Sequence, residues 1–193
     1  PKKTFQLSSL LMADAFWTAV EHAGGVVPGY AQTGRIQPLI DARSLELALQ
    51  RVDSAGRLWP EGVSWNVERV GESDWAPITP TGWVVRDTLS ALLHPRQACD
   101  ALRAALASFG IEVQSAGPDQ GTVIWATGVA GLEELNTGRS RVVGSGVKGQ
   151  AALLRYDARN MPQIFANTVH IIPHLDGTVA VGSTSERDYV DAN

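Results

Sequence analysis

The sequence predicts an α+β fold, in which helices flank a mixed, mainly antiparallel sheet. Apolar residues recur at helical spacing in three stretches between residues 8 and 109, and short strand-like runs separated by turns fill the last third of the chain. The 193 residues are 44% hydrophobic and 19% charged, which is the composition of a globular chain. A chain of this length can bury one core without staples, so we expect a single domain over residues 1–193.

Composition and charge exclude several classes of function. The 16 Lys and Arg residues are outnumbered by 20 Asp and Glu and are scattered along the chain, so a nucleic-acid partner is not expected. No run approaches the ~20 apolar residues of a membrane span, and no signal peptide is recognisable, so the cytoplasm is the expected compartment. The single cysteine, Cys99, excludes an internal disulfide and a cysteine-based metal cluster.

Two helices are predicted near the amino terminus. The first covers residues 8–22 and begins at a serine pair that can cap it. The glycine pair that starts at Gly24 prevents the helix from continuing. Asp41 is a suitable N-cap for the second helix, whose apolar stripe consists of Leu45, Leu49 and Val52. Residues 53–82 are rich in Gly, Pro, Ser and Trp, and we expect an irregular region with short strands there.

The clearest helix begins at His94 and Pro95, because proline is favoured at the first helical position. Gly110 ends this helix, and a strand at 83–85 precedes it. One face of the helix is apolar and is formed by Ala98, Leu102, Ala105, Leu106 and Phe109.

The remaining predicted strands follow this third helix. Two are expected at 111–113 and 122–126, and the second has the Val-Ile-Trp-Ala run of a buried strand. A hairpin turn is predicted at Leu175-Asp176-Gly177. The last third of the chain contributes five further strands, at 141–146, 151–156, 163–165, 168–173 and 178–182.

A glycine-rich segment, residues 144–149, matches the pattern G-x-G-x-x-G of dinucleotide-binding loops. A nicotinamide-binding domain would need a helix that begins near Gly149 and an acidic residue about 20 positions further on. The window 165–170 contains no acidic residue. We therefore prefer a glycine-rich connection between strands and keep the nicotinamide site as an alternative that a strand at 148–156 would exclude.

Two further features are candidate binding residues. His170 lies in an alternating strand with Ile172 on the same face, where an imidazole can line a pocket or simply be hydrogen-bonded beside the core. Ala126-Thr127-Gly128 ends a predicted strand in small residues, which let a ligand approach the backbone, although on these residues alone a strand-to-helix turn that needs glycine is the favoured interpretation. No metal site is predicted, because the other histidines have no Asp, Glu or His at ligand spacing.

Taken in order, these segments resemble the D-amino-acid oxidase family, closest to its glycine-oxidase-like members. The resemblance consists of the helix from His94, then V-I-W-A-T-G at 123–128, V-K-G-Q at 147–150 and H-I-I-P-H-L-D-G-T-V-A-V-G-S-T-S-E at 170–186. The segment T-G-R-I at 33–36 also matches a strand of the family. The likeness extends over most of residues 8–190 and is tightest over 94–187.

The resemblance implies the substrate-binding part of an FAD-dependent oxidoreductase. The reaction would oxidise the C–N bond of a small amine or amino acid by hydride transfer to the flavin. His170 stands where the family often has a substrate-contacting tyrosine, and Ser185 matches a second substrate-binding position. Ala126, Thr127 and Gly128 match the strand end that lies along FAD. The resemblance assigns no catalytic residue and no metal ligand to this chain.

The family's amino-terminal Rossmann βαβ unit would precede residue 1, and its carboxylate-binding arginine would follow residue 193. We therefore expect the isolated chain to be inactive, to bind FAD poorly and to expose apolar surface at 94–128, the boundary with an absent FAD domain. A homodimer through that surface is an expected consequence. The alternative is a non-enzymatic α+β module that binds a ligand or a partner protein.

Overall fold

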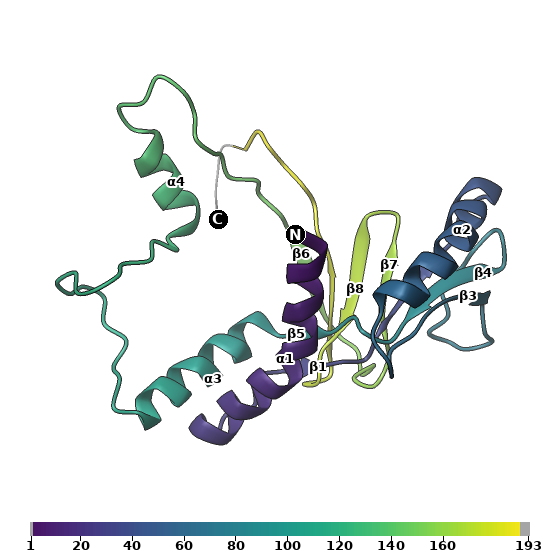
Figure 1. The fold of residues 1–193 in the computed structure, drawn as a ribbon, viewed down its shortest axis with the longest axis horizontal. Coiled ribbons are helices and arrows are strands. Elements are labelled where there is room, and N and C mark those ends of the chain that lie inside the picture. The colour runs from purple at the N-terminus through teal and green to yellow at the C-terminus, as the bar shows by residue number, and fades with distance from the viewer. Residues whose placement is uncertain (1, 190–193) are drawn as a thin grey trace.

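The computed structural model describes residues 2–189 and confirms the predicted α+β class (Figure 1). A seven-stranded sheet has the order β3-β4-β2-β7-β8-β9-β6, and a two-stranded sheet joins β1 to β5. Every strand pair is antiparallel except β2–β7, so the sheet is mixed and mainly antiparallel. The helices are α1 (Lys2–Gly24), α2 (Ala42–Leu58), α3 (Pro95–Ser108) and α4 (Gly128–Asn136). The strands are β1 (Tyr30–Ala31), β2 (Arg35–Pro38), β3 (Trp65–Arg69), β4 (Trp83–Asp87), β5 (Leu92–Leu93), β6 (Ala151–Arg155), β7 (Gln163–Ala166), β8 (Val169–Pro173) and β9 (Thr178–Gly182).

Helices α1 and α3 pack against each other beside the sheet (Figure 1). Their shared core consists of Val20, Ala101 and Ala105, where small side chains on α3 allow the two backbones to approach closely. Helix α1 begins before the predicted serine cap. Its Ser9 hydroxyl donates to the carbonyl of Phe5 one turn earlier, so this serine lies inside the helix instead of starting it.

The second helix begins where the sequence predicts. The Ser44 backbone N–H donates to Asp41 Oδ1 at 2.7 Å, and the Asp41 N–H donates to Ser44 Oγ at 3.1 Å, which is a capping box with serine in place of glutamate. Helix α2 covers one face of the sheet through a cluster of Leu39, Ala48 and Val85. The prediction of an irregular region at 53–82 is wrong at its start, because α2 continues to Leu58, and correct in expecting a short strand, which is β3.

In the last third of the chain, β7, β8 and β9 form an antiparallel meander, and β6 pairs with the outer side of β9. The predictions at 151–156, 163–165, 168–173 and 178–182 are confirmed as β6, β7, β8 and β9. The predicted turn between the last two strands is also confirmed. Gly177 has φ +83°, and the Asp176 carboxylate accepts from the Thr178 N–H at 3.0 Å. This meander carries one of the two groups of predicted site residues.

Three predicted strands, at 111–113, 122–126 and 141–146, are absent from the described chain. A strand forms only where a neighbour satisfies its backbone hydrogen bonds, and no described residue pairs with these segments. The predicted burial of 122–126 is also wrong, because the Ile124 and Trp125 side chains are 85% and 73% exposed. The sequence of residues 122–126 is apolar, as in a buried strand, but no neighbouring strand among the described residues pairs with it.

The chain exposes far more surface than a compact protein of its mass. Its accessible surface is 13,909 Å², whereas a compact 20.6 kDa monomer exposes about 8,900 Å². Figure 1 shows the reason, since α4 and the loops on either side of it arc away from the sheet. Among the described helices, none combines the length and the apolar character needed to cross a bilayer.

Candidate functional site

A cavity of about 490 Å³ lies at one end of the β8–β9 pair. It brings together His170 and Ser185, the two residues predicted to contact substrate. Their neighbours in the wall come from the β7–β8 turn, from the segment after β9 and from the segment before β6. The complete lining consists of Val147, Lys148, Gly149, Thr168, His170, Ser183, Thr184 and Ser185.

His170 is held in a row of residues that crosses four strands. It pairs with Phe165 on β7 and with Gly182 on β9, and Gly182 in turn pairs with Ala151 on β6. The His170 and Phe165 rings are in tilted contact, with centroids 4.4 Å apart. A Cβ at Gly182 would approach the Ala151 Cβ to 2.6 Å, so only glycine fits between these strands. The row therefore sets the position of the imidazole.

Ser185 is positioned by a short antiparallel bridge between Lys148 and Glu186. The Lys148 N–H donates to the Glu186 carbonyl at 2.9 Å, and the Glu186 N–H donates back at 2.8 Å. Thr184 extends the bridge by donating its N–H to the Gln150 carbonyl at 3.0 Å. The segments V-K-G-Q and S-T-S-E are thus held side by side as walls of one cavity.

This bridge decides against the nicotinamide alternative. Lys148 is bridged to Glu186, and strand β6 follows from Ala151, so no helix begins near Gly149. Without a helix amino terminus, the glycines at 144–149 have no phosphate cradle. The glycine-rich segment is therefore no phosphate loop, but it joins two strands only in part, because it leads from α4 through coil and the Lys148 bridge into β6, and the strand expected before it is absent.

The chemistry of the cavity is polar. Four residues with hydroxyl groups, Thr168, Ser183, Thr184 and Ser185, line it together with His170, and the half-buried residue Lys148 is also part of the wall. The Thr184 hydroxyl is already engaged, since it donates to the Glu186 carboxylate at 2.7 Å and accepts from the Gln150 N–H. The sequence analysis missed Lys148. The signal that could have found it is its place in V-K-G-Q, the segment that pairs beside S-T-S-E.

A second, larger cavity of about 700 Å³ contains Ala126, Thr127 and Gly128, the predicted cofactor-binding residues. Because no strand forms at 122–126, Ala126 ends a coil and Gly128 is the first residue of α4, with φ +63°. The Thr127 side chain makes no capping hydrogen bond, so the first N–H groups of α4 are not satisfied by their own cap. The two cavities share no lining residue, so the structure does not bring the two predicted groups into one cavity.

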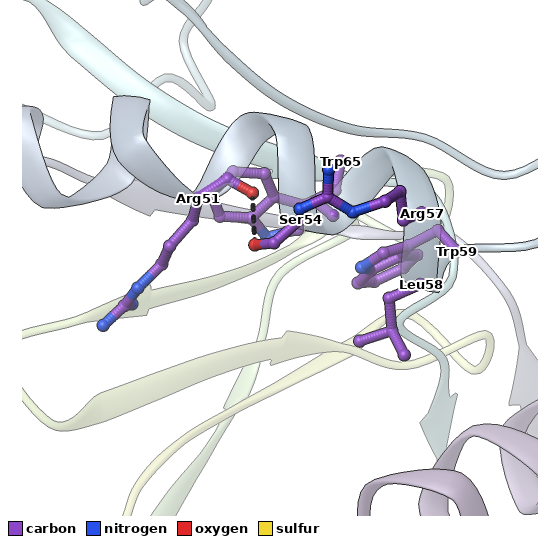
Figure 2. A pocket seen from close by; sticks show the side chains of 7 residues that line it. Arg51, Ser54, Arg57, Leu58, Trp59 and Trp65 are labelled. Carbon is purple, nitrogen blue, oxygen red and sulfur yellow. Dashed lines mark hydrogen bonds between the residues drawn. The ribbon is translucent and has the colours of Figure 1, made fainter.

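A third groove, of about 660 Å³, runs along the carboxyl-terminal half of α2 (Figure 2). Its polar groups do not converge on a common point, because Arg51 reaches away from Arg57 and Trp59 (Figure 2). The Ser54 hydroxyl is engaged with the Arg51 carbonyl at 2.9 Å. We assign no site to this groove. Within residues 2–189, no three His, Cys, Asp or Glu side chains are grouped so that they could hold a metal ion.

Comparison with known proteins identifies the fold. No protein-family model matches the sequence, and no curated protein matches it. Solved structures do match. Glycine oxidase from Geobacillus kaustophilus superposes with a TM-score of 0.70 at 16% identity, over 96% of this chain and 56% of that one. Glycine oxidase from Bacillus cereus gives 0.71 at 15% identity, over 97% and 58%.

Two further solved structures also superpose, with lower TM-scores. Iminodiacetate oxidase from Chelativorans gives a TM-score of 0.67 at 17% identity, over 98% of this chain and 59% of that one. L-Proline dehydrogenase from P. horikoshii gives 0.60 at 12% identity, over 94% and 56%. The chain spans less than three fifths of the length of each of these proteins. At the level of fold, the resemblance to D-amino-acid oxidase-like oxidoreductases is therefore confirmed, over a part of their length.

Proposed function

We propose that this chain is the substrate-binding part of an FAD-dependent oxidoreductase that oxidises the C–N bond of a small amine or amino acid. The observation that carries the proposal is the superposition of nearly the whole chain on glycine oxidase and iminodiacetate oxidase. The order of sequence motifs, from the His94 helix to the S-T-S-E segment, supports the same family independently of the coordinates.

The chain's own residues would bind and orient the substrate. When bound, the flavin supplies the redox chemistry by accepting a hydride from the carbon that carries the amine. His170 contacts the substrate with an imidazole that can donate or accept a hydrogen bond, and Ser185 adds a hydroxyl to the wall. Holding the reacting C–H bond at a fixed angle is the part of catalysis that such a cavity contributes.

The residues at the start of α4 are suited to contact FAD along one side of the cofactor. Ala126, Thr127 and Gly128 are exposed, and the N–H groups that follow lack a side-chain cap, which suits the negatively charged or carbonyl oxygen atoms of FAD. They form a single open wall. FAD held by this wall alone would be bound weakly.

The surface at 94–128 supports a boundary with a flavin-binding domain. Phe109, Ile124 and Trp125 are exposed there, and α1 adds Phe5 and Met12 on its outer face. The chain presents about 5,000 Å² more surface than a compact monomer, whereas a standard protein interface covers about 800 Å² per partner. An excess of this size is typical of a surface covered permanently by another domain or chain.

Titration of the purified 193-residue chain with FAD tests the cofactor proposal. We expect no saturation at micromolar FAD, because the chain supplies one wall only, and tight binding would overturn that view. The activity proposal is tested on the native protein purified from its source, by anaerobic bleaching of flavin absorbance. Glycine, iminodiacetate and proline are suitable first substrates, and a native protein without flavin would favour the non-enzymatic binding module.

A further inference from the structure

Four polar side chains meet where the amino terminus of α3 touches the β8–β9 turn. His94 is the N-cap of α3, and its Nε2 lies 3.6 Å from Asp176 Oδ2 in the turn. His174, which follows β8, places its ring 4.6 Å from the His94 ring, centroid to centroid. Gln97 completes the joint by donating its Nε2–H to Asp176 Oδ2 at 3.2 Å.

The hydrogen bonds assign the proton on His94. Its Nδ1 accepts from the Gln97 backbone N–H at 3.4 Å, so the neutral ring carries its proton on Nε2, which faces the Asp176 carboxylate. A second proton on Nδ1 would remove the acceptor that caps the helix. Protonation of His94 therefore weakens the cap of α3.

His174 is held in an environment suited to its neutral form. Its residue is 4% exposed, and its Nδ1 has no hydrogen-bond partner among the described residues. Burial lowers the pKa of His174, the neighbouring His94 lowers it further, and Asp176 opposes both effects. Charged neighbours of the turn include Arg159, whose partner Asp157 lies 2.8 Å away, and Arg155, which pairs with Thr178 across β6 and β9.

We propose that His94, His174 and Asp176 form an acid-sensitive latch that fastens α3 to the β8–β9 turn when both imidazoles are neutral and releases it when they are protonated. Two imidazolium groups at this ring separation repel each other, and Asp176 can neutralise only one of them. The latch joins α3 to the end of β8. Helix α3 precedes the segment that contains Thr127, and β8 contains His170. It is independent of the proposed enzymatic function.

The direction of the pH dependence follows from proton linkage. An unfolded histidine titrates near pH ~6.5, and the pKa of His174 in the folded protein lies lower. Above that range His174 is neutral in both the closed and the open form, and the latch is at full strength. As the pH falls through that range, the open form binds more protons than the closed form, so the closed form loses stability. Asp176 adds a separate loss at lower pH, because hydrogen bonds from Thr178 lower its pKa.

Amide hydrogen exchange of the 193-residue chain tests the latch. The quantity to follow is the exchange rate divided by the intrinsic rate expected at the same pH. For residues 94–98 and 174–178 this ratio should rise as the pH falls from about 7.5 to about 5, which is the extra acceleration. The rise should be at most about tenfold per pH unit for each linked proton. His174→Gln should abolish the extra acceleration. His22→Gln, which removes an exposed histidine on α1, is the matched control and should retain it.

A second variant keeps the test decisive if His174→Gln does not fold. His94→Asn retains a good helix cap but removes one imidazole, so the extra acceleration should shrink while α3 stays intact. The proposal is overturned if the wild-type protein shows no local acceleration, or if either latch variant responds to acid as the His22→Gln control does.

Discussion

His170 and Phe165 make a tilted ring contact across the β7–β8 pair, with centroids 4.4 Å apart and planes inclined by 35°. His170 lines the candidate substrate cavity, so the aromatic ring supports the imidazole of a lining residue. A pair of this kind contributes about 0.5–1.5 kcal/mol beyond the area that it buries.

Phe165→Leu should therefore impair substrate binding by the native holoprotein without removing any polar group. The expected result is a KM about twofold to tenfold higher with kcat changed less, because the imidazole loses its orientation and not its chemistry. Phe165→Tyr keeps the aromatic ring and serves as the control. Equal KM values for the wild type and Phe165→Leu would contradict a role for the ring contact.

Gly182→Ala should disturb the row that contains His170. The new methyl group would lie 2.6 Å from the Ala151 Cβ, so β6 must shift away from β9, at a cost of about 1–3 kcal/mol in the free energy of unfolding. Urea unfolding measures this loss. Ala151→Gly in the same chain should restore part of the stability, and Gly71→Ala, where a methyl group meets nothing within 4 Å, should be close to neutral.

Asp87 provides a test of the fold away from the cavity. It is 2% exposed, lies 3.3 Å from Arg35 and accepts from the Ser90 N–H at 2.7 Å and the Ser90 hydroxyl at 3.0 Å. Asp87→Ala should lower the free energy of unfolding by about 3 kcal/mol, because these donors lose their buried acceptor.

The matched control for Asp87 is the exposed ion pair of Glu68 and Arg86 on the neighbouring strands, which is 3.7 Å long. Glu68→Gln should change stability by less than about 1 kcal/mol, since solvent screens such pairs. Equal losses for Asp87→Ala and Glu68→Gln in urea unfolding would show that burial of the Asp87 carboxylate has no stabilising role.

The exposed segment around Trp125 should mediate self-association of the chain. Ile124→Lys places a charge on the apolar surface while leaving the described core untouched, so the thermal unfolding midpoint should stay within a few degrees of wild type. Sedimentation velocity should show dimers for the wild type and a shift toward monomer for the variant. Identical sedimentation of both chains would exclude this segment as the contact.

Local sequence rules predicted the elements whose stabilising contacts are also local. The N-cap predicted at Asp41 and the turn predicted at Gly177 depend on residues within three positions, and both are present. The strand predicted at 122–126 failed because strand formation depends on a neighbour, and an apolar run does not reveal whether one is there. The latch could not be predicted from the sequence for a related reason, since His94 and His174 belong to segments that only the folded topology brings together.

The candidate site also combines residues that the sequence could predict with one that depends on the folded topology. His170 and Ser185 were predicted from motif order and lie in one cavity, and the bridge between Lys148 and Glu186 holds two of those motifs side by side. Lys148 was missed because a single lysine beside glycines has no periodicity or spacing of its own. Its proximity to His170 depends on the pairing of β8, β9 and β6.

The parallel pair of β2 and β7 determines when the sheet can form during synthesis. Arg35 pairs with Gln163 and Ile36 with Ile164, so the two strands are separated by about 130 residues of chain. Until the ribosome has released residue 164, β2 has β4 on one side and an open edge on the other. The amino-terminal helices and the β2–β4–β3 sheet therefore emerge as a partial structure with an exposed strand edge, and the nascent chain passes through an aggregation-sensitive interval that ends when β7 docks.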